Sequence, residues 1–172
     1  MGEVRTYEDF PAQMVVVSVL VNISIYALGA LILTGLGPVV AVVYLIYCAY
    51  FEVRVMRHNC VNCCYYGKVC ALGRGKISAY LFPQGNPEIF ARMNFTWTRL
   101  IPDILIMLLP LLGGFILLVR SFSWTVAAGM VLLMALSLGG SAFVRRQIAC
   151  KYCKQWEIGC PAEKFFGGAQ AH

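Results

Sequence analysis

Four long apolar segments restrict this chain to a small number of folds. A helix needs ~20 apolar residues, within a range of ~17–25, to cross the hydrocarbon core of a bilayer. Strands of a membrane barrel alternate between apolar and polar at every second residue, and these segments do not, so helices are favoured. The predicted spans cover approximately residues 12–33, 38–56, 100–119 and 124–144.

The second span is interrupted earlier than the others. Its apolar run extends from Pro38 to Phe51 before Glu52 follows. It reaches spanning length if Glu52, Arg54 and Arg57 lie at the interface and extend their charged ends toward the headgroups. The first segment is longer than a signal-peptide core and follows acidic residues, so we interpret it as a retained helix.

The overall composition also requires a solvent other than water. The chain has 172 residues, enough for a single domain, and is 60% hydrophobic but only 13% charged. Soluble domains carry roughly 25% charged residues. Disorder is excluded because it requires low hydrophobicity. We therefore predict an all-α integral membrane protein with one membrane domain, residues 1–172.

Basic residues predict the orientation of this domain. The connection between the first two spans carries no charge, and that between the last two carries only Arg120. Most other Lys and Arg residues lie in the middle segment and the C-terminal tail, so both should be cytoplasmic, together with both termini, in the inner (cytoplasmic) membrane. We interpret the net charge of +6 as this orientation signal and as attraction to anionic lipid, not as nucleic-acid binding.

One cysteine spacing, C-x2-C-x6-C, occurs twice, 90 residues apart. The copies are Cys60, Cys63 and Cys70, then Cys150, Cys153 and Cys160, and each follows a long apolar stretch. The spacing predicts a tandem duplication, with repeat one at 1–90 and repeat two at 91–172. Each half has an even number of spans, so the halves should be parallel hairpins related by an axis along the membrane normal, which would bring the triads together.

The triads suit a soft metal centre. Cytosolic thiols stay reduced, so close cysteines there more often bind metal or do redox work. Structural zinc and iron–sulfur clusters both usually take four ligands, which leaves the fourth ligand of each triad open. The Cys160-Pro161 pair, which also closes ferredoxin-type runs, favours iron–sulfur over zinc. The candidate ligands are Cys60, Cys63, Cys64, Cys70, Cys150, Cys153 and Cys160.

The stretch from Cys63 to Gly75 resembles the cysteine loops of four-helix membrane iron–sulfur subunits of nitrate- and nitrous-oxide-reductase systems. Those loops often run Cys-x3-Cys-Pro, followed by Gly. Here five residues separate Cys64 from Cys70, and Ala71 replaces the proline. The resemblance covers only this stretch, and no counterpart of that family's ferredoxin domain is seen. It implies that a four-span bundle with cytosolic cysteine loops can transfer electrons from the quinol pool.

Other features predict packing and short surface helices. Gly29, Gly113, Gly114, Gly139 and Gly140 would let helices approach closely. Asp103 after Pro102 is typical of a helix start, and Pro110 should bend the third span. Tyr44, Tyr47 and Phe51 form a stripe beside Cys48, for which packing is favoured over a quinone or carotenoid site. Short interfacial helices are predicted at 77–82 and 89–97, with Pro87 at a start.

Three functions remain open from the sequence. The preferred one is an iron–sulfur electron-transfer or redox-complex subunit, whose partners would be the bilayer, a redox protein or larger membrane complex, and a lipid quinone. The second is a zinc-stapled membrane scaffold without catalysis. The third is a quinone-coupled thiol–disulfide oxidoreductase, which needs the cysteines near the outer face. The sequence shows no recognised catalytic constellation, so whether the chain is an enzyme stays undecided.

Overall fold

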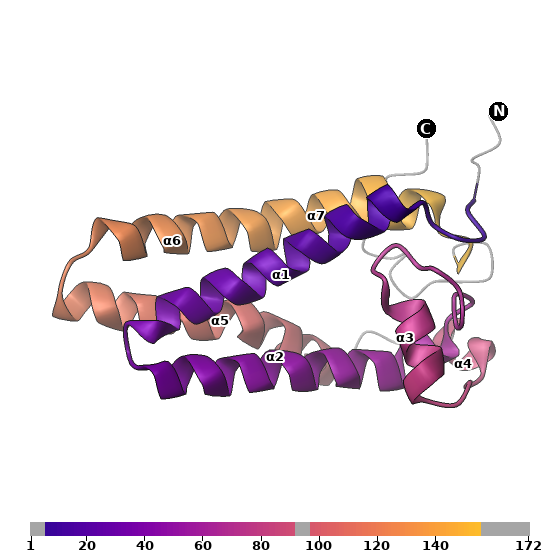
Figure 1. Cartoon of the computed structure of the whole chain (residues 1–172), viewed down its shortest axis with the longest axis horizontal. Coiled ribbons are helices and arrows are strands. Elements are labelled where there is room, and N and C mark those ends of the chain that lie inside the picture. The colour runs from indigo at the N-terminus through magenta and orange to yellow at the C-terminus, as the bar shows by residue number, and fades with distance from the viewer. Residues whose placement is uncertain (1–5, 92–96, 156–172) are drawn as a thin grey trace. The chain divides into compact units, whose positions relative to one another are not determined.

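The computed structural model describes residues 6–91 and 97–155, and within these residues the chain is helical apart from its turns and one β-bridge. Four helices there are long and apolar enough to cross a membrane, in agreement with the predicted number (Figure 1). The first three are α1 (Ala12–Thr34), α2 (Pro38–His58) and α5 (Trp97–Arg120). The fourth is a continuous candidate span from Trp124 to Tyr152.

The fourth span is composite. It begins as α6 (Trp124–Met134), passes through a π-helical stretch (Ala135–Gly140) and continues as α7 (Ser141–Phe143). A second π-helical stretch, Val144–Ala149, follows. The helix therefore extends past residue 144, where we predicted its end. The added residues include exposed Arg145, Arg146 and Gln147, which a helix can carry outside an apolar layer.

Two other differences concern shorter elements. Helix α5 starts at Trp97, so Pro102 and Pro110 both lie inside it, and Asp103 is not at a helix start as predicted. Two short helices, α3 (Arg74–Leu81) and α4 (Pro87–Ala91), confirm the expectation of helices in the middle segment, including a start at Pro87. The predicted stretch 89–97 is only partly covered, because residues 92–96 lie outside the described part.

The chain divides into two compact units. The first, called here the cysteine unit, comprises the described residues of Met1–Val19, Val53–Phe95 and Phe143–His172. The second, called the bundle unit, comprises those of Leu20–Glu52 and Thr96–Ala142. This division does not follow the boundary between the two proposed repeats, because each unit takes residues from both halves of the sequence. Both cysteine motifs belong to the cysteine unit.

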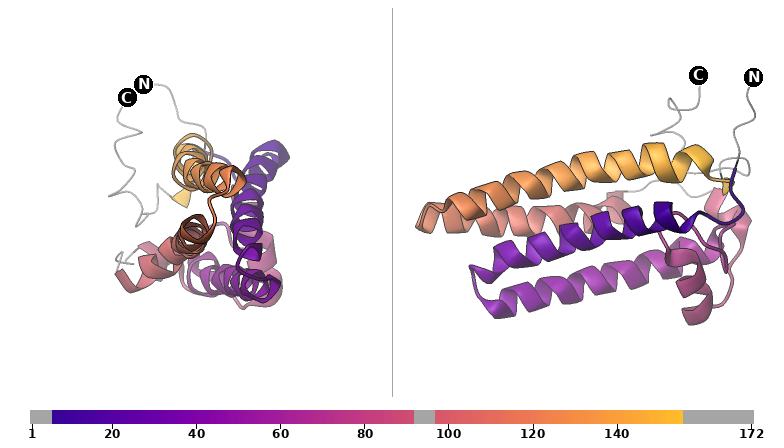
Figure 2. Two further views of the ribbon diagram at one scale, coloured as in Figure 1. Left: turned by 90° about the vertical axis from the view of Figure 1, so that its left-hand side faces the viewer. Right: turned by 45° about the horizontal axis from the view of Figure 1, so that its top comes forward.

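Small residues bring the helices of the bundle unit together, and the four segments lie side by side in both views of Figure 2. A Cβ atom on Gly29 of α1 would lie 2.5 Å from the Tyr44 hydroxyl of α2. Gly113 of α5 meets Leu33 of α1 in the same way, and Gly140 approaches Val21 of α1. Helix α1 thus touches all three other spans. The predicted contact role is confirmed for these glycines, but nothing lies within 4 Å of the Cβ position of Gly139.

The tyrosine stripe of α2 fastens this helix to α5. The Tyr44 hydroxyl, in a side chain only 3% exposed, donates to the Ile106 carbonyl at 3.0 Å. The Tyr47 hydroxyl donates to the Pro102 carbonyl at 2.9 Å. Pro110 has no N–H, so the Ile106 carbonyl four residues earlier lacks its helical donor. Tyr44 supplies that donor, which matters because an unpaired carbonyl is costly in apolar surroundings.

A second tyrosine, Tyr26 of α1, forms a hydrogen bond with Glu52 of α2. The Tyr26 hydroxyl of α1 donates to Glu52 at 2.5 Å, and both residues belong to the bundle unit. At 1.5 Å rise per residue, Glu52 lies about 21 Å along α2 from Pro38. The carboxylate of Glu52 is thus hydrogen-bonded to a neighbouring helix, because Tyr26 places a hydroxyl within reach.

We predict that Tyr44→Phe lowers the free energy of unfolding in mixed micelles by about 1 kcal/mol, the scale of an interhelical hydrogen bond in a membrane protein. The matched control is Tyr50→Phe on the same helix, because Tyr50 is 60% exposed. Equal losses in the two variants, measured by detergent titration, would show that the Ile106 carbonyl does not depend on Tyr44.

Candidate cysteine site

The two cysteine motifs start with the same local fold. Each C-x2-C pair begins a 3₁₀ turn, Cys60–Asn62 in the first copy and Cys150–Tyr152 in the second. The second cysteine of each pair is extended and closes the turn with its N–H, from Cys63 to the Cys60 carbonyl at 3.2 Å and from Cys153 to the Cys150 carbonyl at 3.4 Å. Each turn follows a long helix, so the repeated spacing corresponds to a repeated conformation.

Glycines close the loop of the first motif. Gly67 and Gly73 adopt left-handed φ angles of 76° and 74°, which residues with a side chain rarely adopt. The Gly73 N–H bonds to the Cys70 carbonyl at 2.9 Å. The Gly75 N–H then donates to the Cys70 sulfur at 3.3 Å. A Cβ on Gly75 would collide with the carbonyls of Tyr65 and Lys68, so only glycine fits there.

The cysteines of the two copies converge on one apolar cluster. The cluster, called here the Phe10 cluster, consists of buried Phe10, Tyr65 and Ala71. The partly buried residues packed against it include Cys63, Cys64 and Cys70 of the first motif and Cys153 of the second. Residues 90 positions apart in the sequence therefore surround the same buried aromatic rings. Cys63 and Cys70 of the first triad, Cys153 of the second and the additional Cys64 thus share the Phe10 cluster as a neighbour.

The Tyr65 phenol joins three segments of the cysteine unit. Its hydroxyl donates to the Tyr7 carbonyl at 2.6 Å and accepts the Lys154 N–H at 3.0 Å. Nearby, the Cys64 N–H donates to the side chain of Gln155 at 2.8 Å, and Gln155 is only 1% exposed. The backbone of the second motif is thus held against the first by hydrogen bonds with buried side chains.

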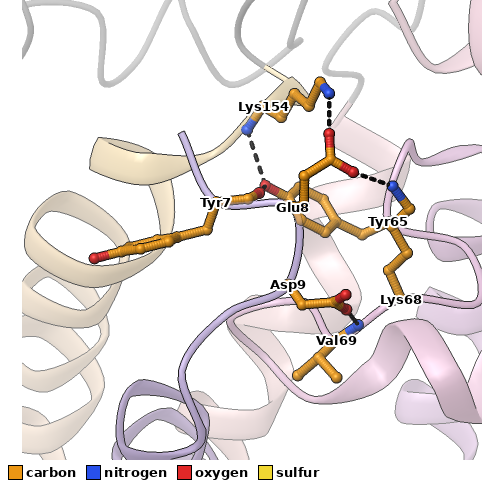
Figure 3. A network of polar contacts seen from close by, with 7 residues as sticks. All are labelled: Tyr7, Glu8, Asp9, Tyr65, Lys68, Val69 and Lys154. Atoms are coloured by element: carbon orange, nitrogen blue, oxygen red, sulfur yellow. Dashed lines mark hydrogen bonds and ion pairs between the residues drawn. The ribbon is translucent and has the colours of Figure 1, made fainter. Parts of the chain in front are cut away.

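The segment before α1 also binds both motifs (Figure 3). The Tyr7 N–H donates to the Tyr152 carbonyl at 3.1 Å, and Tyr7 pairs with Cys153 in a parallel β-bridge. Further along, the Phe10 N–H donates to the Val69 carbonyl at 3.0 Å, and the Val69 N–H donates to the Asp9 carboxylate at 2.7 Å. The N-terminal segment therefore lies between the two loops and bonds to each.

Glu8 adds a charge bridge between the motifs. Its carboxylate pairs with Lys154 of the second motif and with Lys68 of the first, the latter at 2.6 Å (Figure 3). Hydrogen bonds from Lys154 and Lys68 lower the pKa of Glu8 from 4.5 to about 2. All three side chains are exposed, so water and salt screen the pairs, and their contribution to stability is small.

Neighbouring thiols have opposite tendencies to ionise. The Cys64 thiol donates a hydrogen bond to Cys63 and, with backbone N–H groups of Tyr65 and Cys64, lowers the pKa of Cys63 from 9.0 to about 7, although burial opposes this. The same bond and burial raise the pKa of Cys64, and negative charge on Cys63 and Cys153 raises it further. Cys153 of the second motif is therefore close enough to act electrostatically on the first.

The Phe10 cluster does not include every candidate ligand. Cys60 and Cys150 are half-buried and are not among the residues packed against the Phe10 cluster. Cys160 lies outside the described residues. Within the part of the chain that the structure describes, no three His, Cys, Asp or Glu side chains are arranged to hold one metal ion. If the cysteines other than Cys160 coordinated a metal ion by themselves, their side chains would have to turn toward a common point.

Sequence reasoning missed the residues that bring the motifs together, which are Tyr7, Glu8, Tyr65 and Gln155. The sequence alone presents Glu8 and Asp9 only as acids that precede an apolar segment. The available signal was charge complementarity, because the acid Glu8 pairs with Lys68 and Lys154, which follow the first and the second C-x2-C pair. Nothing in the sequence marks the buried Gln155 as a partner of the Cys64 backbone.

Comparisons with protein-family models, curated proteins and solved structures gave no match to this chain.

We predict that alkylation of Cys63 in reduced, metal-free protein increases with pH through a midpoint of about 7, while Cys64 stays unreactive in that range. Cys64→Ala removes the S–H donor and should move the Cys63 midpoint toward 9.0, the usual value. Mass spectrometry of the labelled peptide measures both. Cys48→Ala, in the bundle unit, is the control. An unchanged midpoint in Cys64→Ala would contradict the assigned donor.

Proposed function

We propose that this chain is an integral membrane protein that holds a cysteine-ligated metal centre on its cytoplasmic side and takes part in electron transfer as an iron–sulfur subunit. The observation that carries the proposal is the convergence of Cys63, Cys64, Cys70 and Cys153 on the Phe10 cluster. Thiolates from both motifs, with Cys160 as a further donor, would form one shared centre. Cysteine thiolates are the usual ligands of such clusters.

The surroundings of the thiols favour a cluster that changes charge. Lys68 and Lys154 lie beside the motifs, and two lysines paired with the single Glu8 carboxylate leave net positive charge that would offset part of the negative charge of several thiolates and a reduced cluster. The Gly75 N–H bond to the Cys70 sulfur is of the kind that tunes cluster potentials. These features favour iron–sulfur over a zinc staple, for which no change of charge has to be accommodated. The electron partner would be a redox protein or a lipid quinone.

The proposal includes a duplicated architecture. In it, residues 1–90 and 91–172 are parallel hairpin repeats, each with two spans followed by a cysteine motif. The matching 3₁₀ turns at Cys60 and Cys150 support duplication, because unrelated loops with the same cysteine spacing need not share a conformation. The distribution of Lys and Arg supports a topology with both termini and both motifs in the cytoplasm.

We predict that protein purified without oxygen contains iron and acid-labile sulfide and shows broad visible absorption. Cys63→Ser and Cys153→Ser, one in each motif, should each remove most of the metal, because both thiolates serve one centre. Cys48→Ser, a buried cysteine of α2, is the control and should retain it. Elemental analysis of the three variants provides the measurement.

The double variant sharpens this experiment. With one shared centre, Cys63→Ser combined with Cys153→Ser loses no more metal than either change alone. With two separate sites, each single variant would instead lose about half of the bound metal. The double variant would then lose the sum of the two losses. Unchanged metal in both single variants would refute the proposal, and zinc without iron would favour the scaffold function.

We predict opposite labelling of two introduced cysteines by a membrane-impermeant maleimide. Ser121→Cys lies after α5 and should react in intact cells, whereas Gln84→Cys lies between α3 and α4 and should react only after the membrane is opened. Both positions are exposed, so reactivity reports sidedness. The reverse pattern would place the cysteine motifs outside the cytoplasm and favour the thiol–disulfide oxidoreductase.

A further inference from the structure

Helix α3 presents an apolar face that no described residue covers. Ile77 and Leu81 are each 51% exposed, and Tyr80 is 90% exposed. Tyr80 and Leu81 follow Ile77 by three and four residues, so all three side chains lie on one side of the helix. The opposite side carries Gly75 and Ser78, both buried. The apolar side chains therefore point away from the rest of the cysteine unit.

The packing of α3 prevents this face from turning inward. The Ser78 hydroxyl donates to the Gly75 carbonyl at 2.8 Å within the buried side. Gly75 lies so close to the carbonyls of Tyr65 and Lys68 that no side chain fits between them. Rotation of the helix would bring Ile77 or Tyr80 into this space. The outward direction of the apolar face is thus imposed by backbone contact.

The start of α3 lies beside the apolar part of α1. Gly73, the residue that precedes α3, has its Cβ position 3.3 Å from a methyl of Val19 and 3.4 Å from one of Val15. Along α1, these valines lie about 10 Å and about 5 Å past Ala12 at 1.5 Å rise per residue. All of these residues belong to the cysteine unit. Helix α3 therefore begins at the level where a candidate membrane span is already apolar.

The charges next to this face suit anionic lipid. Lys76 is exposed and adjacent to Ile77, and Arg74 occupies the first position of the helix. Basic side chains beside an apolar and aromatic face are typical of helices that lie in the interface of a membrane. A large tyrosine that exposes most of its surface is likewise suited to the headgroup layer.

We propose that the face of α3 formed by Ile77, Tyr80 and Leu81 lies in the headgroup–acyl boundary of the same bilayer, with Lys76 at anionic phosphates. The site would recognise phospholipid of net negative charge. Its effect is to hold the first cysteine motif at the lipid surface, because the loop that contains Cys70 leads directly into α3. This docking does not depend on which metal the cysteines bind.

Photocrosslinking of the full-length protein tests this docking. Tyr80→p-benzoylphenylalanine is compared with Gln84→p-benzoylphenylalanine, a matched exposed position beyond the helix. Each protein is reconstituted in vesicles of zwitterionic phospholipid with or without an anionic phospholipid. We expect several-fold more lipid adduct at position 80 than at position 84. Lys76→Gln should abolish the further gain that anionic lipid gives at position 80.

Two outcomes would overturn the proposal. Lipid adducts at position 80 that are as few as those of a fully water-exposed position would show that the face is in water. If the probe at position 80 crosslinks to peptides, and its lipid adducts are no more abundant than those at position 84, a protein covers the apolar face of α3. Tyr80→Glu provides a second readout: it should speed tryptic cleavage after Lys76 in vesicles while leaving thermal stability in detergent unchanged, because position 80 makes little internal contact.

Discussion

The phenol of Tyr65 is the interaction on which the cysteine unit depends most. Its ring is 3% exposed inside the Phe10 cluster, and its hydroxyl serves both as donor to Tyr7 and as acceptor from Lys154. A hydroxyl can satisfy a carbonyl and an N–H at once, which no aliphatic side chain can do. One residue of the first motif thus fixes both the segment before α1 and the backbone of the second motif. The convergence of the cysteines follows from this arrangement.

Tyrosine has a comparable role in the bundle unit, for the same physical reason. Its ring packs between apolar helices while its hydroxyl reaches a polar group on the neighbouring helix. Tyr44 compensates for the donor that Pro110 lacks, and Tyr26 holds the carboxylate of Glu52. Both units therefore combine apolar packing with a few hydrogen bonds from buried rings. Gly29 provides the close approach that places the Tyr44 ring against α1.

The sequence predicted features that depend on composition and spacing. Apolar length determined the four long helices, and the starts of α1 and α2 were correct to the residue. The shared spacing of the cysteines indicated that Cys63 and Cys153 occupy equivalent positions. The sequence could not predict the end of the fourth span or the start of α5, because prolines and polar residues are tolerated within helices when their surroundings permit. It also could not assign Gln155, whose role depends on an unpaired N–H that only the folded loop creates.

The ion pairs of Glu8 have a consequence for biosynthesis. Glu8 and Lys154 are 146 positions apart, so one partner is made almost at the start of translation and the other near its end. The pairing of Glu8 with Lys68 becomes possible much earlier. During translation the N-terminal segment can therefore dock on the first loop once α1 and α2 have been made and before α5 and the fourth span have been synthesised. The second motif is synthesised last and packs against a first motif that is already docked on the N-terminal segment. The cysteines of the two motifs can therefore share the Phe10 cluster only when nearly the whole chain has been made.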